Sequence, residues 1–318
     1  MSEIVIVTTY QREPFLFCCL DHIRKIEPKI EIHVFPDRGT WKDPEVRETC
    51  RHFDAKIHLV PKHEYLGNSY NCLEAYRWAF NEGADFVHLI EDDVIVHADF
   101  FSWHRTMHDE WNDIFASMAW IFNRHIPLID DVVFQPWIYS IGVCIPRDKL
   151  AAIVEHASPL YYADMPGYIR EVFKDSKINS PYSIAHYEQD GLIQRVLDRM
   201  KLQTVSPTIG RCTHLGCIGY NQGWDHRADF FKGAETFAER VNRIEEFLAD
   251  PYWRAQFFDR EVVEYETGRR LPPRLFNYRI ELPDGWTSEF SSELTRDKLP
   301  RRINSVDLSP DARIVLES

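Results

Sequence analysis

Apolar runs and amphipathic stretches alternate along roughly the first 95 residues of the chain. The apolar runs, each typical of a buried strand, lie at 4–7, 30–35, 56–60 and 85–94. Between them, apolar residues recur at helical spacing over 14–23, 44–53 and 68–80. This alternation predicts an α/β fold, with a parallel, doubly wound central sheet that is flanked by helices.

The rest of the chain has a less regular pattern. Further strands are predicted at 116–122, 137–145 and 275–282, and further helices at 99–114, 149–156, 187–200 and 237–248. Residues 157–182, rich in Tyr, Pro and Gly, predict a long loop of the kind that often has a function in a compact domain. We therefore expect one large domain in two parts, 1–115 and 116–225, and a C-terminal helical and irregular extension over 226–318.

Composition narrows the class of protein. The chain has 318 residues, of which 44% are hydrophobic, so it can bury a large core. Acidic residues outnumber basic ones by 50 to 37, and a net charge of -13 disfavours binding to nucleic acid or to an anionic membrane. Because no signal peptide or bilayer-spanning run is present, we expect a cytoplasmic protein. The seven scattered cysteines, with no Cys-x-x-Cys pair, are expected to be reduced thiols.

Polar side chains follow three of the predicted strands, at the point where each strand ends. Thr8, Thr9 and Arg12 follow the first strand, Asp37 follows the second, and the acids 91–93 follow the fourth. The carboxyl ends of parallel strands share one edge of a sheet, and ligands of open α/β sheets bind at that edge. The sequence therefore predicts one binding site to which all three clusters contribute.

The acidic triplet Glu91-Asp92-Asp93 is the strongest chemical signal of the three. Three adjacent carboxylates at the end of a buried strand repel one another, so either one of them takes up a proton or a cation lies among them. Oxygen ligands suit manganese or magnesium, and magnesium often bridges a carboxylate to a phosphate. The ordinary alternative is a solvated acidic turn.

The order and spacing of these motifs resemble those of a known family. The segments that carry the resemblance are 4–12, 34–39, 74–79, 91–94, 99–101 and 118–120. Over roughly residues 3 to 215 the chain resembles the glycosyltransferases of the GT-A fold, which use nucleotide sugars, and is similar to the N-acetylglucosaminyltransferase family that initiates complex N-glycans. The resemblance implies a Rossmann-like, mostly parallel central sheet, with donor binding in 1–115 and acceptor binding and catalysis in 116–225. The Golgi members carry a membrane anchor that this chain lacks, so we expect a bacterial or viral protein.

By the same resemblance, the acidic triplet stands in for the Asp-x-Asp motif of the family. Asp93 would bind manganese or magnesium directly, and Asp92 or Glu91 would hold the sugar or the ribose. Many GT-A enzymes bring a late histidine back to the metal, which makes His214 the second metal ligand. The alternative for His214 is an ordinary histidine, one of 14 in the chain.

A catalytic base is expected in the segment 186–192, which resembles the Glu-Asp-x-x-Leu type motif of inverting GT-A enzymes. Asp190 aligns with the catalytic aspartate of that motif, and Glu188 is the alternate base. Gln189 stands where the family commonly has an acid. The competing interpretation is that Asp190 is an acid favoured by the dipole at a helix N-terminus.

The remaining predicted contacts concern the nucleotide and the sugars. The donor pocket is expected to include Thr8, Thr9, Arg12, Asp37, Asn68 and Asn71. Asn68 is alternatively a simple helix cap, and Asp37 a turn-forming residue. Trp120 and Trp137 are candidates for stacking on sugar rings, although aromatic residues in strands more often belong to the core.

The leading hypothesis is a metal-dependent, inverting glycosyltransferase that uses a UDP-sugar. Its acceptor is left open among a glycan, a lipid-linked sugar, a protein and a modified base in viral DNA; late arginines at 269–270, 274 and 301–302 permit DNA, but the net charge does not indicate it. One alternative is a nucleotidyltransferase acting on sugar phosphates, which normally has a Gly-rich basic loop after the first strand, whereas residues 8–12 contain no glycine. The other is a non-catalytic protein that binds sugar nucleotides, and the joint presence of acids, a base candidate and a late histidine argues against it.

Overall fold

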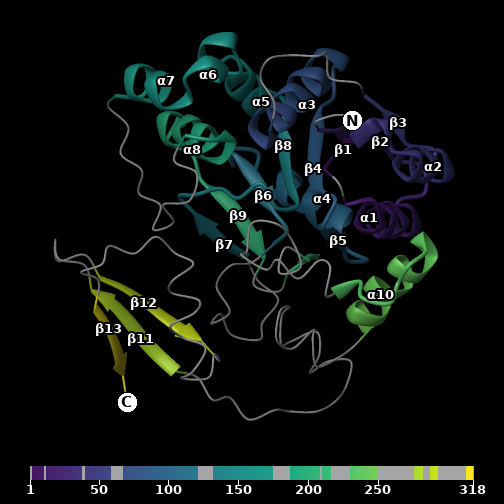
Figure 1. Cartoon of the computed structure of the whole chain (residues 1–318). Helices are drawn as coiled ribbons and strands as arrows, with labels where there is room; N and C mark the ends of the chain where they lie inside the picture. Colours follow the sequence, from purple (N-terminus) through teal and green to yellow (C-terminus); the bar gives the residue numbers. More distant parts are fainter. Residues whose placement is uncertain are drawn as a thin grey trace.

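The computed structural model describes residues 2–10, 12–37, 40–58, 67–120, 132–174, 187–207, 210–215 and 230–249, and three strands farther along the chain. An eight-stranded sheet runs through the centre in the order β3-β2-β1-β4-β8-β6-β9-β7 (Figure 1). Its strands are β1 (Glu3–Thr9), β2 (Glu31–Pro36), β3 (Lys56–Ile57), β4 (Phe86–Glu91), β6 (Ala116–Met118), β7 (Val132–Gln135), β8 (Val143–Pro146) and β9 (Thr204–Pro207).

The sheet is mostly parallel, as predicted. Strands β3, β2, β1 and β4 pair in parallel, and β6 pairs in parallel with β9. The insertion of β8, antiparallel to both β4 and β6, and of β7, antiparallel to β9, makes the second half of the sheet mixed. The parallel arrangement that the first 95 residues predict is therefore confirmed in that half of the sheet, and the sheet as a whole is mostly parallel.

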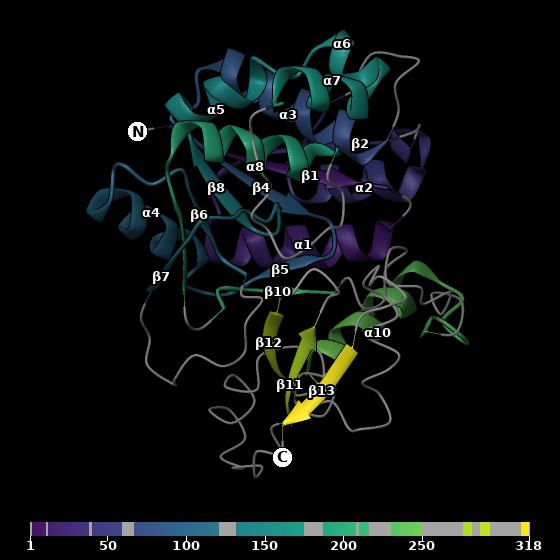
Figure 2. The same cartoon turned by 90° about the vertical axis from the view of Figure 1, so that its left-hand side faces the viewer.

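Helices cover both faces of the sheet (Figures 1 and 2). One layer holds α3 (Asn68–Glu82), α5 (Arg147–Val154), α6 (Pro159–Ala163), α7 (Met165–Val172) and α8 (Gln189–Met200). The other holds α1 (Glu13–Ile26), α2 (Pro44–His52), α4 (Phe100–Glu110) and α10 (Phe237–Ala249). The alternation of side chains along β1 explains both layers, because Ile4 and Ile6 pack into the first core whereas Val5 and Val7 pack into the second.

Two parts of the sequence prediction were wrong after residue 130. Instead of a long loop over 157–182, the described part of this segment forms α6 and α7. Each of these helices begins with a side-chain cap, since Ser158 Oγ accepts from Tyr161 N and Asp164 Oδ1 accepts from Gly167 N. The strand predicted over 137–145 begins only at Val143, because the preceding residues lie at the site edge without a ladder partner among the described residues.

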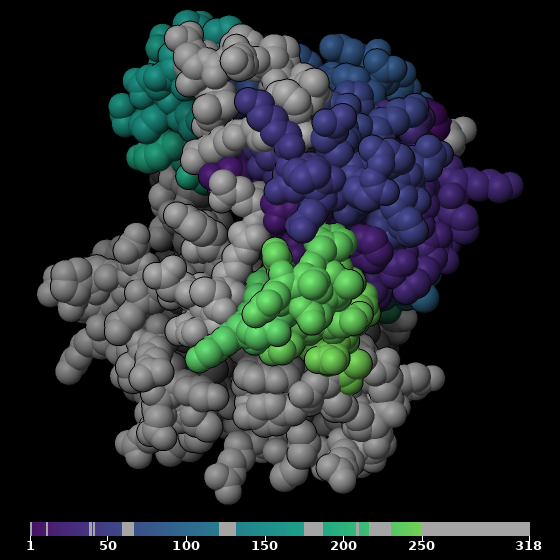
Figure 3. Space-filling view, turned by 45° about the vertical axis from the view of Figure 1, so that its right-hand side comes forward, coloured from purple at the N-terminus to yellow at the C-terminus, as the bar shows by residue number. Residues whose placement is uncertain are grey.

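The helix α10 belongs to the extension predicted over 226–318, and it packs on the N-terminal part of the fold. Figure 3 shows α10 (green) lying against the surface formed by the purple N-terminal segments. Ile244 and Phe247 join the buried core of α1 and α2, and the ring of Phe237 meets that of Phe17 edge-on at 5.7 Å. Farther on, β11 (Phe276–Glu281), β12 (Thr287–Ser292) and β13 (Arg313–Glu317) form an antiparallel sheet in the order β12-β11-β13.

Six of the cysteines are described, and all six are buried free thiols, as expected. Within the described residues, no helix combines the length and the apolar character that crossing a bilayer requires.

Gly142 fixes the approach of β8 to the segment that carries His214. Its φ of +59° lies in the left-handed region, and a Cβ added there would lie 2.9 Å from Cys212 Sγ. We expect Gly142→Ala to lower the free energy of unfolding by about 2–4 kcal/mol, from backbone strain and overpacking together. Chemical denaturation measures this loss. Gly233→Ala is the control, because Gly233 has a φ of +80° and a Cβ added there would meet no atom of the described residues within 4 Å, so only the backbone cost is expected. Equal losses in both variants would contradict the packing argument.

Candidate active site at the carboxyl edge of the sheet

The carboxyl ends of β1 and β4 lie side by side and form the floor of the site. Thr8 is in register with Glu91, the last residue of β4. The chain turns at residues 92 and 93 and continues as β5 (Val94–Val96), which pairs with β10 (Cys212–His214) so that His214 is opposite Val94. A hydrogen bond of 2.7 Å from Leu215 N to Asp93 O holds the end of β10 against this turn. The pairing thus brings His214 beside the acids.

Asp92 fastens the acidic turn to the end of β1. Its side chain is 1% exposed, and its Oδ2 accepts from Thr9 Oγ1 at 2.7 Å and from Tyr10 N at 3.2 Å. The backbone N of Asp92 also donates to Thr8 O at 3.0 Å. Asp92 is therefore held by the protein itself, and this anchoring sets it apart from the other two acids.

Glu91, Asp93 and His214 form the group that can hold a metal ion. One ligand atom from each lies within 4.8 Å of the others. His214 Nε2 is 3.4 Å from Asp93 Oδ2, and Asp93 Oδ1 is buried without a hydrogen-bond partner among the described residues. A buried carboxylate oxygen that has no partner is costly unless a cation or proton reaches it. Two carboxylates and one imidazole suit manganese, so the residues present fit the expected ion.

The charged groups of the site shift one another's pKa values. Burial and the charge of Asp93 raise the pKa of Glu91 to about 7, and burial raises the pKa of Asp92 to about 6. Burial acts in the same direction on Asp93, but the neighbouring His214 and Arg12 outweigh it and hold the pKa of Asp93 well below its usual range. Burial lowers and Asp93 raises the pKa of His214, with a net increase. Asp93 is therefore the acid that stays ionised and attracts cations.

Asp190 lies at the same end of the sheet, in the first turn of α8. Ser140 Oγ donates a hydrogen bond to Asp190 Oδ1. Burial raises the pKa of Asp190, and the negative charge of Asp190 in turn contributes to the raised pKa of Glu91. Glu188, the alternate base, is the exposed N-cap residue of α8. Of the two candidates, Asp190 is half-buried beside the acidic triplet, whereas Glu188 is exposed.

Gln189, which departs from the family motif, has a structural partner. Ser69 Oγ donates to Gln189 Oε1 at 2.6 Å and accepts from Gln189 N at 3.2 Å. This pair ties the start of α8, which carries Asp190, to the start of α3. Sequence reasoning missed both Ser69 and Ser140, because a serine in a loop or helix start carries no signal for a partner far away in the chain.

The residues predicted to contact the nucleotide lie near the carboxyl edge of the sheet, but several of them already form hydrogen bonds within the protein. Asp37 Oδ1 accepts from Gly67 N at 3.4 Å, and buried Asn71 Nδ2 donates to Phe35 O at 2.7 Å. Asn68 is the first residue of α3 rather than its cap; the cap is Gly67, so that alternative was wrong. Arg12, which the sequence predicts to contact the donor, pairs with Asp92 and Asp93.

The two candidate tryptophans lie in different places. The ring of Trp120 meets the His214 ring edge-on at 6.0 Å and the Tyr139 ring at 5.9 Å, so Trp120 borders the metal group. The backbone of Trp137 lies beside the start of β9, where its oxygen accepts from Thr204 Oγ1 at 2.6 Å. Of the two, Trp120 is the better placed to meet a sugar.

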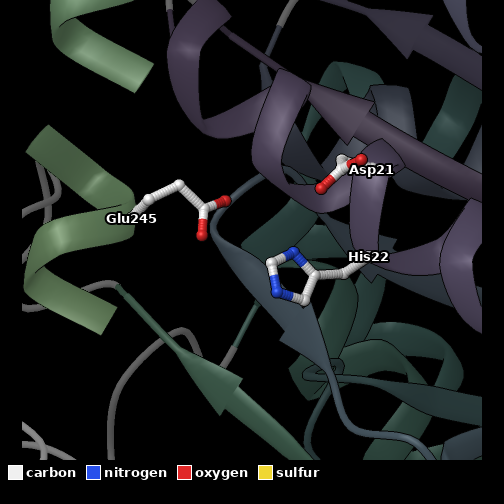
Figure 4. A group of neighbouring side chains, drawn as sticks. All are labelled: Asp21, His22 and Glu245. Atoms are coloured by element: carbon white, nitrogen blue, oxygen red, sulfur yellow. The ribbon is translucent and has the colours of Figure 1, made fainter. Parts of the chain in front are cut away.

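A second group with metal-binding residue types lies between α1 and α10. Figure 4 shows Asp21 and His22 of α1 facing Glu245 of α10. Lys25 Nζ binds Asp21 Oδ2 at 2.5 Å, and His22 Nδ1 is 2.9 Å from Cys18 O. The described atoms of this group include no buried carboxylate oxygen without a partner, unlike Asp93 Oδ1. Of the two groups, Glu91, Asp93 and His214 therefore fit a metal ion better.

Comparison with known proteins identifies no family. No family model and no curated protein matches the sequence. Among solved structures, the chain is similar to TarS of S. aureus (TM-score 0.39, 15% identity over 82% of this chain) and spans 44% of the length of that structure. Its similarity to TarS 1-349 has the same TM-score, with 13% identity over 90% of this chain and 96% of that one. A CMP:2-keto-3-deoxy-manno-octonic acid synthetase complexed with CTP gives 0.37, with 11% identity over 65% of this chain and 89% of that one. These TM-scores are too low to support a functional argument, so the function is argued from the site.

Proposed function

We propose that this protein is a metal-dependent glycosyltransferase that moves a sugar from a nucleotide sugar, expected to be a UDP-sugar, to an acceptor hydroxyl. The observation that carries the proposal is the convergence of Glu91, Asp93 and His214 beside the half-buried Asp190 at the carboxyl edge of the sheet. A cluster of metal-binding residues alone is compatible with many functions, and a single carboxylate is compatible with even more. Their combination at the ligand-binding edge of an α/β sheet fits glycosyl transfer to a hydroxyl.

Each component has a defined task in this reaction. A divalent cation held by Glu91, Asp93 and His214 would neutralise negative charge on the departing diphosphate. Asp190 would take the proton of the acceptor hydroxyl as its oxygen bonds to the anomeric carbon and the bond from that carbon to the diphosphate breaks. A base on the acceptor side of the sugar leads to inversion at the anomeric carbon.

A donor screen with the full chain tests this proposal. Thermal unfolding would be followed with UDP-, GDP-, CMP- and TDP-sugars, each with manganese or with a chelator. We expect one class of nucleotide sugar, UDP-sugars first, to raise the melting temperature only with manganese, because a ligand that binds the folded state stabilises it. That donor would then be offered to glycan, lipid-linked and protein acceptors, with release of the nucleoside diphosphate, or of CMP from a CMP-sugar, as the readout.

The alternative functions predict different results in this screen and in the activity assays that follow it. A shift that the chelator leaves unchanged, or no shift with any donor, would contradict the metal–diphosphate site. Release of pyrophosphate from a nucleoside triphosphate and a sugar phosphate would identify a nucleotidyltransferase instead. Manganese-dependent donor binding without transfer to any acceptor and without slow hydrolysis of the donor would indicate a binding protein.

A further inference from the structure

Arg12 occupies an unusual position in the site. It is the N-cap residue of α1, but its side chain makes no cap hydrogen bond. The guanidinium instead reaches the acidic turn, where Nε lies 3.3 Å from Asp92 Oδ1 and Nη1 binds Asp93 Oδ2. The side chain is 22% exposed, whereas those of Asp92 and Asp93 are 1% and 5% exposed. Arg12 therefore covers two buried acids from the solvent side.

The two acids that Arg12 contacts differ in what else they bind. Asp92 is anchored by Thr9 and by the backbone of Tyr10 and is not part of the ion group. Asp93 belongs to the ion group and shares its Oδ2 between Arg12 and His214. An ion bound at Asp93 would place two positive charges beside the guanidinium, and this repulsion opposes the simultaneous presence of both. The Asp92 contact, in contrast, is compatible with a bound ion.

We propose that Arg12 is an exchangeable counter-charge of this site. In the ion-free protein it neutralises Asp92 and Asp93. When a divalent cation binds among Glu91, Asp93 and His214, the guanidinium leaves Asp93, keeps Asp92 as its anchor and donates to the diphosphate of the donor. The planar guanidinium suits this exchange, because its forked donors match phosphate oxygens as well as they match carboxylates.

This inference rests on the proposed function for the identity of the diphosphate ligand, and it assigns separate roles to the three acids. Glu91 and Asp93 hold the ion, and Asp92 holds the arginine that meets the donor. Arg12 thus links the two binding events. Its guanidinium would leave Asp93 when the ion binds, and it would then donate hydrogen bonds to the diphosphate of the donor. We therefore expect donor binding to depend on the ion even where the ion itself makes few donor contacts.

Binding measurements on the full chain test the exchange without reference to activity. Calorimetry with manganese alone is expected to show about tenfold tighter binding by Arg12→Gln than by wild type, because a competing charge-assisted hydrogen bond has been removed. With manganese saturating, the same variant is expected to bind UDP and inorganic pyrophosphate about tenfold more weakly, since one charged donor to phosphate is lost. Opposite changes for the two ligands are the signature of exchange.

Arg51→Gln is the matched control. Arg51 is 67% exposed and pairs with Glu48 on α2, so neither affinity is expected to change. If Arg12→Gln binds manganese no more tightly than wild type, Arg12 does not compete with the ion and the inference is overturned. If neither protein binds manganese, both the inference and the proposed function fail. If wild type binds manganese and UDP and Arg12→Gln shows the opposite changes, but wild type transfers no sugar, only the proposed function fails.

Discussion

Asp93→Asn is expected to abolish manganese-dependent stabilisation by the donor. Asp93 is the acid whose pKa is held well below its usual range, and its Oδ1 is a buried carboxylate oxygen without a hydrogen-bond partner among the described residues. Asparagine has the same shape but lacks the charge that attracts the cation. Since loss of a residue that merely supports a metal ligand typically costs 10–100-fold in affinity, loss of the ligand's charge is expected to cost at least about a hundredfold. Calorimetry with manganese and thermal unfolding with the donor measure the effect.

The second metal-type group supplies the control for this substitution. Asp21→Asn makes the same chemical change in the group between α1 and α10. Manganese affinity and the donor-induced shift are expected to stay at the wild-type level in this variant. If Asp21→Asn removes the shift and Asp93→Asn retains it, the ion has been placed at the wrong group. Near-ultraviolet circular dichroism of the ion-free variants checks that both remain folded.

Asp190→Asn is expected to lower the transfer rate by about 10²–10⁴-fold, the typical contribution of a positioned general base. Asparagine can still accept the hydrogen bond from Ser140 Oγ, so donor binding and the manganese-dependent shift are expected to persist. The rate under saturating donor, compared with the thermal shift, separates catalysis from binding. Glu188→Gln is the matched variant at the alternate base, and we expect it to retain most of the rate because Glu188 is exposed. A large loss in Glu188→Gln alone would reassign the base.

The pH dependence of transfer gives a second readout for Asp190. A base must be ionised to accept a proton, so the rate falls as pH drops through its pKa. Because burial raises the pKa of Asp190, this fall is expected at a higher pH than for an ordinary aspartate. The hydrogen bond from Ser140 acts in the opposite direction and favours the ionised form. Ser140→Ala is therefore expected to move the fall to a still higher pH.

Several features of the fold follow from local sequence patterns. The four-residue apolar run 4–7 has apolar side chains on both faces, so it can only be a strand covered on both sides, and helices of both layers do cover it. The amphipathic helices α1, α3 and α8 could be predicted for the same reason, because their periodicity is local. The two small helices α6 and α7 could not, since their capping residues, Ser158 and Asp164, lie among prolines and tyrosines that are equally typical of a loop.

The acids of the site could be predicted, but their division of labour could not. Glu91, Asp92 and Asp93 are consecutive, so the sequence alone does not distinguish which of them would bind the ion. The turn after β4 directs Asp92 toward Thr9 and brings Glu91 and Asp93 to His214. Arg12 was predicted to contact the donor, but nothing in its sequence context indicates that its side chain also reaches Asp92 and Asp93.

The sequence by itself determined the order of strands and helices in the first half, the edge where polar residues gather and the residue types available there, because each of these depends on neighbours in the chain. Only the tertiary structure decided which residues meet. The pairing of β10 with β5 brings His214 to the acids. The hydrogen bond between Ser69 and Gln189 joins residues that are 120 positions apart in the chain. Such contacts depend on how strands and helices pack, and a serine or arginine has the same sequence signature whichever distant partner the packing gives it.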